Sequence, residues 1–137
     1  MYTTETILRV RYSETDQMGF VYYGNYASYY EVARADMMRT LGATYKEMEE
    51  KGCMMPMLSM SVRYKKPARY DDRLRIVTRI SEMPQTRMTF THEVFHADTG
   101  QLLNIGETTL AFINSTSHKP MRIPPWFIEL INKKLNN

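Results

Sequence analysis

The chain has 137 residues, a length that predicts one domain over residues 1–137 rather than two independently folded units. Hydrophobic residues make up 43% and charged residues 24%, which excludes the composition of a disordered chain and predicts a packed core. The 18 Lys and Arg residues give a net charge of only +3 against 15 Asp and Glu residues, and they are dispersed, so no nucleic-acid partner is expected.

The only cysteine is Cys53, which rules out an intramolecular disulfide and a four-cysteine zinc site. The first residues show no basic segment followed by an apolar run, and no stretch of ~18 consecutive apolar residues occurs. We therefore expect a protein of the reduced cytoplasm, with neither an export signal nor a membrane span.

The first predicted element is a half-buried strand over residues 6–12. Leu8, Val10 and Tyr12 fall on one of its faces, and this period of two is typical of a strand with one side against a core. The polar residues 13–17 follow it. We therefore expect the strand to end in a loop that leads into the next element.

The second predicted element is a long helix over residues 26–41. Its apolar positions recur every three or four residues, and Gly42 stands where a C-cap glycine belongs. Thr44 and Glu47 then have the spacing of a capping box, which predicts a brief second helix ending at Gly52. The polar face of the long helix is expected to carry Glu31, Arg34, Asp36 and Arg39.

Four more strands are expected in the C-terminal half of the chain. The first begins at Pro56, where a missing N–H donor is tolerated, and the last contains Gly106 at a bulge or a point of close approach. Turn residues separate the last three strands, which predicts an antiparallel meander. A short amphipathic helix is expected after Pro125. The predicted strands cover residues 56–66, 74–80, 87–96 and 101 to about 114.

The order of these elements is strand, long helix, short helix and four strands. It is typical of an α+β domain in which one largely apolar helix packs on a sheet of about five strands. In the strand over residues 56–66, one face carries the larger apolar side chains. They are Leu58, Met60, Val62 and Tyr64.

A group of motif residues lies between the first strand and the long helix. Residues 13–26 read Ser-Glu-Thr-Asp-Gln-Met-Gly-Phe-Val-Tyr-Tyr-Gly-Asn-Tyr, and residues 64–72 add a second segment. From the first strand to about Phe112 the chain resembles the 4-hydroxybenzoyl-CoA thioesterase-like branch of the hotdog acyl-CoA thioesterases. This resemblance implies a curled antiparallel sheet of about five strands wrapped around one long central helix. The most specific positions are Asp16, Gly19, Asn25 and Tyr26.

The resemblance implies that Asp16 is the catalytic carboxylate, acting on an acyl thioester as nucleophile or general base, and that the backbone N–H of Tyr23 polarises the carbonyl. Both roles suit a helix start, where unpaired N–H groups and a partial positive charge stabilise an oxyanion. Some relatives carry a histidine at the position of Tyr23, so no mechanism that needs an imidazole there is expected. On spacing alone, Asp16 fits a loop or capping role, and Glu14 is the nearest alternative carboxylate.

Two further groups of residues are expected to contact the substrate. Those for the acyl group are flexible thioethers and aromatic rings, with core packing as the alternative for each. They are Tyr22, Tyr26, Met55 and Met57. Those for the coenzyme A phosphates are basic, with a solvated strand face as the alternative. They are Arg63, Lys65 and Arg87.

The hairpin before Arg87 differs from the family pattern, in which several basic residues often occur. It holds Pro84, Gln85 and Thr86. The resemblance therefore leaves three functions open. The chain is expected to be an acyl-CoA thioesterase acting on a fatty or aromatic acyl thioester, an acyl-acyl-carrier-protein thioesterase, or a non-catalytic protein that binds acyl thioesters.

No metal or other cofactor is expected. His92 and His96 fall on one face of a strand, too far apart to hold one ion without further ligands, and Cys53 suits a partly buried turn better than a nucleophile. The resemblance also implies a homodimer or homotetramer with joined sheets, because a single subunit leaves one sheet edge open and holds only part of the substrate groove.

Overall fold

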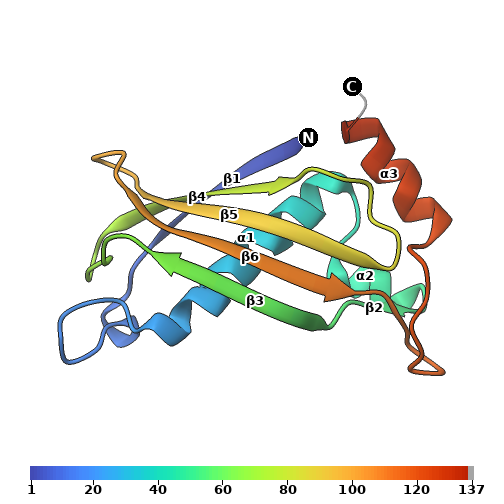
Figure 1. Ribbon diagram of the computed structural model, residues 1–137, viewed down its shortest axis with the longest axis horizontal. Coiled ribbons are helices and arrows are strands. Elements are labelled where there is room, and N and C mark those ends of the chain that lie inside the picture. Colours follow the sequence, from blue (N-terminus) through green and yellow to red (C-terminus); the bar gives the residue numbers. More distant parts are fainter. Residues whose placement is uncertain (136–137) are drawn as a thin grey trace.

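The computed structural model describes residues 1–135 and contains a five-stranded antiparallel sheet in the order β1-β4-β5-β6-β3. The helix α1 (Tyr26–Leu41) lies along one face of this sheet (Figure 1). The predicted α+β class and the β4-β5-β6 meander are therefore confirmed. The sheet strands are β1 (Tyr2–Arg9), β3 (Met57–Tyr64), β4 (Arg73–Ile80), β5 (Arg87–His96) and β6 (Leu102–Ala111).

Smaller elements occupy the two ends of α1. At the end where α1 terminates lie α2 (Tyr45–Glu50), the two-stranded ribbon of β2 (Cys53–Met54) with β7 (Ile113–Asn114), and α3 (Pro125–Leu135), as Figure 1 shows. The other end holds a loop framed by two 3-10 turns, η1 (Tyr12–Glu14) and η2 (Tyr23–Asn25). No helix among residues 1–135 combines the length and the apolar character needed to cross a bilayer.

The helix α1 packs closely on β6 because β6 carries a glycine there. A Cβ atom at Gly106 would fall within the ring of Tyr30, so no larger residue fits without a shift. The Tyr30 hydroxyl continues past this point and donates to Asn104 Oδ1 at 2.5 Å. Gly106 is thus a point of close approach, one of the two roles that the sequence left open.

The predicted end of the long helix and the predicted start of the short helix are also confirmed, whereas the short helix ends at Glu50 rather than at Gly52. Gly42 has φ +94°, and its N–H donates to the carbonyls of Met38 and Arg39 at 3.1 Å. The Thr44 hydroxyl accepts the N–H of Glu47 at 3.1 Å, as an N-cap does. These local signals predict where α1 stops and where α2 begins.

Three further details of the prediction were wrong. The strand β1 ends at Arg9, because its partner β4 begins at Arg73 opposite it, and Tyr12 is 77% exposed in η1. The last predicted strand is interrupted at Phe112, after which β7 pairs with β2, a strand that was not predicted. Arg34, expected on the polar face of α1, is only 4% exposed.

The strand β3 forms an open edge of the sheet. It pairs with β6 alone, so nothing among residues 1–135 covers its other side. Its apolar side chains are correspondingly exposed, with Leu58 at 49% and Tyr64 at 54%. Exposed apolar side chains therefore gather along this edge.

Candidate active site

The loop that precedes α1 is a tight turn over residues 15–21. Its two sides pair through a bridge between Thr15 and Val21, and the N–H of Asp16 donates to the carbonyl of Phe20 at 2.8 Å. Gly19 closes the turn with φ +84°, a conformation that favours glycine. The motif positions Asp16 and Gly19 therefore build one compact structure.

Glu14 ties this loop to the helix. Its carbonyl accepts the N–H of Tyr22 at 2.9 Å and the side-chain amide of Asn25 at 2.7 Å. Its carboxylate accepts the hydroxyl of Tyr29 at 2.9 Å and the N–H of Arg11 at 2.8 Å. Glu14 also forms an ion pair with Arg11 at 3.4 Å. Its carboxylate is thus occupied by structural contacts, and its anchoring role was not predicted.

The other side of the loop rests on the turn over residues 67–72. The N–H of Val21 donates to the carbonyl of Ala68 at 2.8 Å, and Phe20 forms a bridge with Arg69. The guanidinium of Arg69 also lies over the ring of Phe20, 4.9 Å from its centroid. These contacts fix the position of the Asp16 loop relative to the end of β3.

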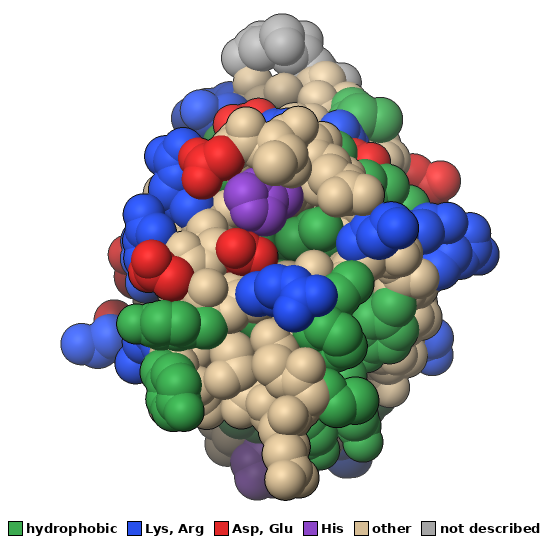
Figure 2. Space-filling view, turned by 90° about the vertical axis from the view of Figure 1, so that its left-hand side faces the viewer, with side chains coloured by type: hydrophobic (Ala, Val, Ile, Leu, Met, Phe, Trp, Pro, Cys, Tyr) green, Lys and Arg blue, Asp and Glu red, His purple; other side chains and the backbone are tan. Residues whose placement is uncertain are grey.

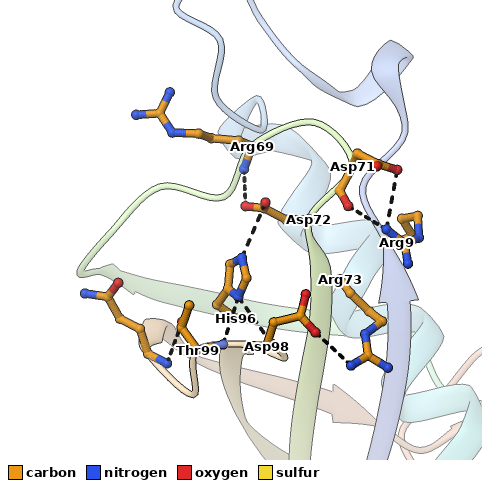
Figure 3. Close-up of polar contacts among 9 residues, drawn as sticks. Arg9, Arg69, Asp71, Asp72, Arg73, His96, Asp98 and Thr99 are labelled. Atoms are coloured by element: carbon orange, nitrogen blue, oxygen red, sulfur yellow. Dashed lines mark hydrogen bonds and ion pairs between the residues drawn. The ribbon is translucent and has the colours of Figure 1, made fainter.

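That turn is itself braced by a polar cluster, drawn in Figure 3. The carboxylate of Asp72 accepts the N–H of Arg69 at 2.9 Å and lies 3.4 Å from Nε2 of His96. Nδ1 of His96 accepts the N–H groups of Asp98 and Thr99 at 3.3 and 3.2 Å. The neutral imidazole therefore carries its proton on Nε2 and donates it toward Asp72. The cluster ties the turn to the β5–β6 hairpin.

Asp16 opens into a cavity of about 350 Å³ between the loop, the start of α1 and the end of β3. Its Oδ1 accepts the N–H of Met18 at 2.9 Å and, more weakly, that of Phe20 at 3.4 Å. Its Oδ2 has no hydrogen-bond partner among residues 1–135. The cavity is lined by Asp16, Met18, Phe20, Val21, Tyr23, Tyr26, Tyr64, Lys65, Lys66 and Pro67.

Unpaired backbone donors occur at the start of η2, beside this cavity. Tyr23 and Gly24 begin η2, which leads directly into α1, and neither N–H has an acceptor within the described chain. Tyr23 lines the cavity with Asp16. Burial raises the pKa of the neighbouring Tyr26 to about 12, so this side chain stays a neutral phenol. The cavity thus combines a carboxylate oxygen with helix-start donors.

The end of the molecule that holds this cavity has an apolar surface with basic side chains beside it. Figure 2 shows it with apolar side chains gathered on one side, and with Lys and Arg side chains beside them. Among the residues expected to bind coenzyme A, Lys65 lines the cavity together with Lys66, and both side chains are exposed. An apolar cavity with cations at its border suits a ligand that is apolar at one end and anionic at the other.

The structure separates the other expected site residues from Asp16. Tyr22 lies outside the cavity, where its ring covers Gly24 and packs on Tyr23 at a centroid distance of 4.6 Å. Met55 and Met57 line a second cavity, of about 280 Å³. Arg87 lines a third, of about 480 Å³, at the β4–β5 hairpin, whereas Arg63 lines none of these three.

His92 and Cys53 are core residues. His92 is fully buried between the hydroxyls of Thr78 and Thr108, at 3.1 and 3.0 Å. Burial lowers its pKa to about 3, which keeps the ring neutral. Cys53 is fully buried, and burial raises the pKa of its thiol. Among residues 1–135, no group of three or more His, Cys, Asp or Glu residues is arranged to hold a metal ion.

Known proteins resemble the chain over nearly its whole length. Residues 10–131 match the family described as the thioesterase-like superfamily. The acyl-CoA thioester hydrolase YbgC of Escherichia coli is 33% identical over 117 residues, covering 85% of this chain and 87% of that protein. A DHNA-CoA thioesterase structure from Staphylococcus aureus superposes with a TM-score of 0.90 at 34% identity, covering 97% of this chain and 91% of that one.

A more distant structure shows the same fold. A 4-hydroxybenzoyl CoA thioesterase variant, solved in complex with 4-hydroxybenzoyl CoA, superposes with a TM-score of 0.85 at 22% identity. That match covers 95% of this chain and 99% of that one. The chain therefore belongs to the thioesterase-like superfamily, as a hotdog-fold member of its acyl-CoA thioesterases.

Proposed function

We propose that the chain hydrolyses acyl-CoA thioesters to a free acid and coenzyme A, with Asp16 as the catalytic carboxylate. One observation carries this proposal. Asp16, whose Oδ2 has no partner among residues 1–135, lines an apolar cavity together with Tyr23, whose backbone N–H begins η2 and has no acceptor there either. Thioester hydrolysis needs both a carboxylate near the carbonyl carbon and donors near its oxygen.

The reaction follows from these two groups. With Asp16 as general base, its carboxylate takes a proton from water while the water oxygen attacks the thioester carbon. The carbonyl oxygen becomes an oxyanion, which the N–H of Tyr23 stabilises at the positive end of the helical segment. The tetrahedral intermediate then expels the thiolate, which accepts the proton from Asp16. With Asp16 as nucleophile, its carboxylate oxygen attacks the thioester carbon and displaces the coenzyme A thiolate, and water then cleaves the resulting acyl anhydride to the free acid and the Asp16 carboxylate.

The coenzyme is expected to leave the cavity past its basic border. Lys65 and Lys66 are exposed there and can approach phosphate groups, whereas Arg87 lies on the β4–β5 hairpin with Arg79. Arg63 is an exposed residue of β3 outside all three cavities. We therefore assign the first phosphate contacts to Lys65 and Lys66. An acyl carrier protein would present its phosphopantetheine to the same border.

The test of Asp16 is the substitution Asp16→Asn. It keeps the side-chain shape and an acceptor for the Met18 N–H, but it removes the basic oxygen, so we expect kcat/KM to fall by roughly 10²–10⁴-fold. Release of free thiol from a panel of acyl-CoA and acyl-carrier-protein thioesters measures the rates. Asp71→Asn is the matched control, because Asp71 is exposed with φ +69°, which asparagine tolerates.

The control variant should keep wild-type rates, and both variants should keep the wild-type melting temperature. Undiminished turnover by Asp16→Asn would exclude Asp16 from the reaction. Tight binding of every thioester without release of thiol, in the wild-type protein, would instead identify a non-catalytic binding protein.

A further inference from the structure

Arg34 is a buried cation that forms no ion pair with any residue among 1–135. It lies on the third turn of α1, is only 4% exposed, and its Nε and Nη1 atoms are buried without a hydrogen bond. No carboxylate among residues 1–135 forms an ion pair with it. Buried arginines are nearly always paired, because the charge loses its hydration and needs compensation. An unpaired one therefore points to a missing anion.

A second unpartnered polar group lies beside it. The hydroxyl of Tyr45, on α2, is buried and makes no hydrogen bond among the described residues. Burial raises the pKa of this hydroxyl, and the charge of Arg34 and its side-chain interaction with the hydroxyl oppose that effect, so the two side chains are neighbours. The Tyr45 hydroxyl is therefore neutral and available as a donor. Two buried donors from different helices converge on one place.

Both side chains line a cavity of about 280 Å³ between α1, α2 and the β3–β6 edge of the sheet. Met55, Met57 and Leu110 form its apolar walls. Glu31 and Glu49 also line it, but both are exposed, so water and salt screen their charges. The cavity thus offers apolar walls for a short hydrocarbon segment and a buried cation for its end.

No other group near Arg34 compensates its charge. His92 lies close enough for the charge of Arg34 to lower its pKa further, after burial, and it is neutral at pH 7. The remaining neighbours on its own helix, Tyr30 and Ala33, are buried and uncharged. Glu31 and Glu49 line the same cavity but form no ion pair with Arg34, so the charge of Arg34 is available to an anion from outside residues 1–135.

The cavity lies where the far end of an acyl group could reach. Arg34 is eight residues beyond Tyr26 on α1, about 12 Å along the helix axis from the Asp16 cavity. Met57 and Tyr64 mark the two ends of β3, one beside each cavity. Antiparallel pairing of two copies through β3 would bring the Arg34 cavity of one copy toward the Asp16 cavity of the other.

We propose that Arg34 and Tyr45 bind a carboxylate at the far end of the acyl group, so that the enzyme prefers ω-carboxyacyl thioesters over neutral ones. This inference rests on the proposed function, since the acyl group is that of the thioester cleaved at Asp16. Arg34 would be a specificity-determining residue rather than a group that takes part in hydrolysis.

The test compares each ω-carboxyacyl-CoA with its own methyl ester, using glutaryl-, adipoyl- and suberoyl-CoA. The two members of a pair differ in charge and hardly in shape, so the ratio of their kcat/KM values reports recognition of the carboxylate. We expect at least one chain length with a wild-type ratio of about tenfold or more. Arg34→Met should bring this ratio to about one while methyl-ester turnover persists, and Tyr45→Phe should lower it by a smaller factor.

Arg39→Met is the matched control, because Arg39 is an exposed arginine of the same helix that pairs with Asp36. It should keep the wild-type ratio. If Arg34→Met does not fold, the wild-type ratios decide alone, and ratios of one or less at every chain length overturn the inference. An unchanged ratio in folded Arg34→Met, with altered oligomeric state in light scattering, also overturns it and assigns Arg34 to an interface.

The two proposals fail in different ways. Hydrolysis of neutral acyl-CoA with no carboxylate preference rejects the arginine site and leaves the thioesterase intact. If no thioester is cleaved, the proposed function fails, and titration calorimetry with free adipate then judges the site. Binding to the wild-type protein that Arg34→Met abolishes supports it, and absence of binding to the wild-type protein rejects it.

Discussion

His92 is a polar residue that the core accepts only in its neutral form. Each ring nitrogen faces a threonine hydroxyl, Thr78 on one side and Thr108 on the other, and its ring stacks on Tyr30 at a centroid distance of 4.5 Å. A neutral imidazole can donate at one nitrogen and accept at the other, which both hydroxyls can match. An imidazolium would be buried beside the cation of Arg34, so proton uptake is unfavourable in the folded state.

This burial makes the stability of the protein depend on pH. The pKa of His92 is lowered to about 3 when folded, whereas an unfolded histidine has its ordinary pKa near 6.5. Below pH 6.5 the unfolded state therefore binds a proton that the folded state does not, and the free energy of unfolding falls as the pH falls. The expected contribution is about 1.4 kcal/mol per pH unit, or about 2 kcal/mol between pH 6.5 and 5.

Urea unfolding at pH 7 and pH 5 measures this contribution. The variant His92→Gln, which cannot take up the proton, should lose about 2 kcal/mol less than the wild type over that range. His118→Asn is the control, because His118 is exposed with φ +59° and asparagine tolerates that conformation. Equal pH dependence in His92→Gln and wild type would show that His92 does not remain neutral in the fold.

At the scale of elements, the contact between α1 and β6 depends on the absence of a side chain at Gly106. Gly106→Ala places a methyl group inside the space of the Tyr30 ring, so either the ring must leave its site or α1 must move away from the sheet. Overpacking of this kind destabilises proteins by roughly 1–3 kcal/mol. We expect a loss of that size in the free energy of unfolding measured with urea.

A neighbouring substitution separates this effect from a general loss in β6. Glu107→Ala changes the next residue of the strand, which is exposed on the other face, and it should alter stability by less than about 0.5 kcal/mol. Equal stability of Gly106→Ala and Glu107→Ala would mean that Tyr30 can be displaced without cost.

Local signals predicted the elements whose limits depend on nearby residues. Gly42 ends α1 and Thr44 begins α2, because a glycine in the left-handed region and a capping hydroxyl act within one turn. The limits of β1 depend instead on β4, more than sixty residues away, which supplies partners only as far as Arg9. The sequence near Tyr12 alternates as a strand does, but it has no partner strand to pair with.

The residues of the candidate site also fall into two groups, those placed by nearby residues and those placed by distant ones. Asp16 and Tyr23 were predicted together, because seven residues of one loop connect them and the motif specifies that loop. Met55 and Met57 belong to a different cavity, since the chain passes from α2 through β2 into β3 there and they line that cavity with Arg34 and Tyr45. Arg34 was predicted to lie on the exposed polar face of α1. The pattern of polar and apolar residues along α1 does not indicate that a second helix, α2, lies over this side chain.

At the scale of the whole molecule, the open edge of β3 sets the expected assembly. An exposed strand edge with apolar side chains invites pairing with another strand, and Leu58 and Met60 are exposed on this edge, beside an irregularity in the pairing with β6 between Met57 and Ser59. Edge pairing of two copies joins their sheets, and an isologous pair is closed and self-limiting. In one copy the end of β3 lies beside Asp16. Antiparallel pairing brings that end close to the start of β3 in the second copy.

We therefore expect a dimer through β3, and the substitution Leu58→Lys tests it. A lysine at this exposed site leaves the fold of one copy intact but places two like charges at the interface between the copies, so the dimer should dissociate.

Ile7→Lys is the matched control, because Ile7 is 51% exposed on β1, at the opposite edge of the sheet. Light scattering should give a dimer or tetramer for the wild type and Ile7→Lys, and a smaller species for Leu58→Lys. If the acyl site spans both copies, thioester hydrolysis should fall together with dimerisation. A wild-type monomer that hydrolyses thioesters would mean that one copy holds the complete site.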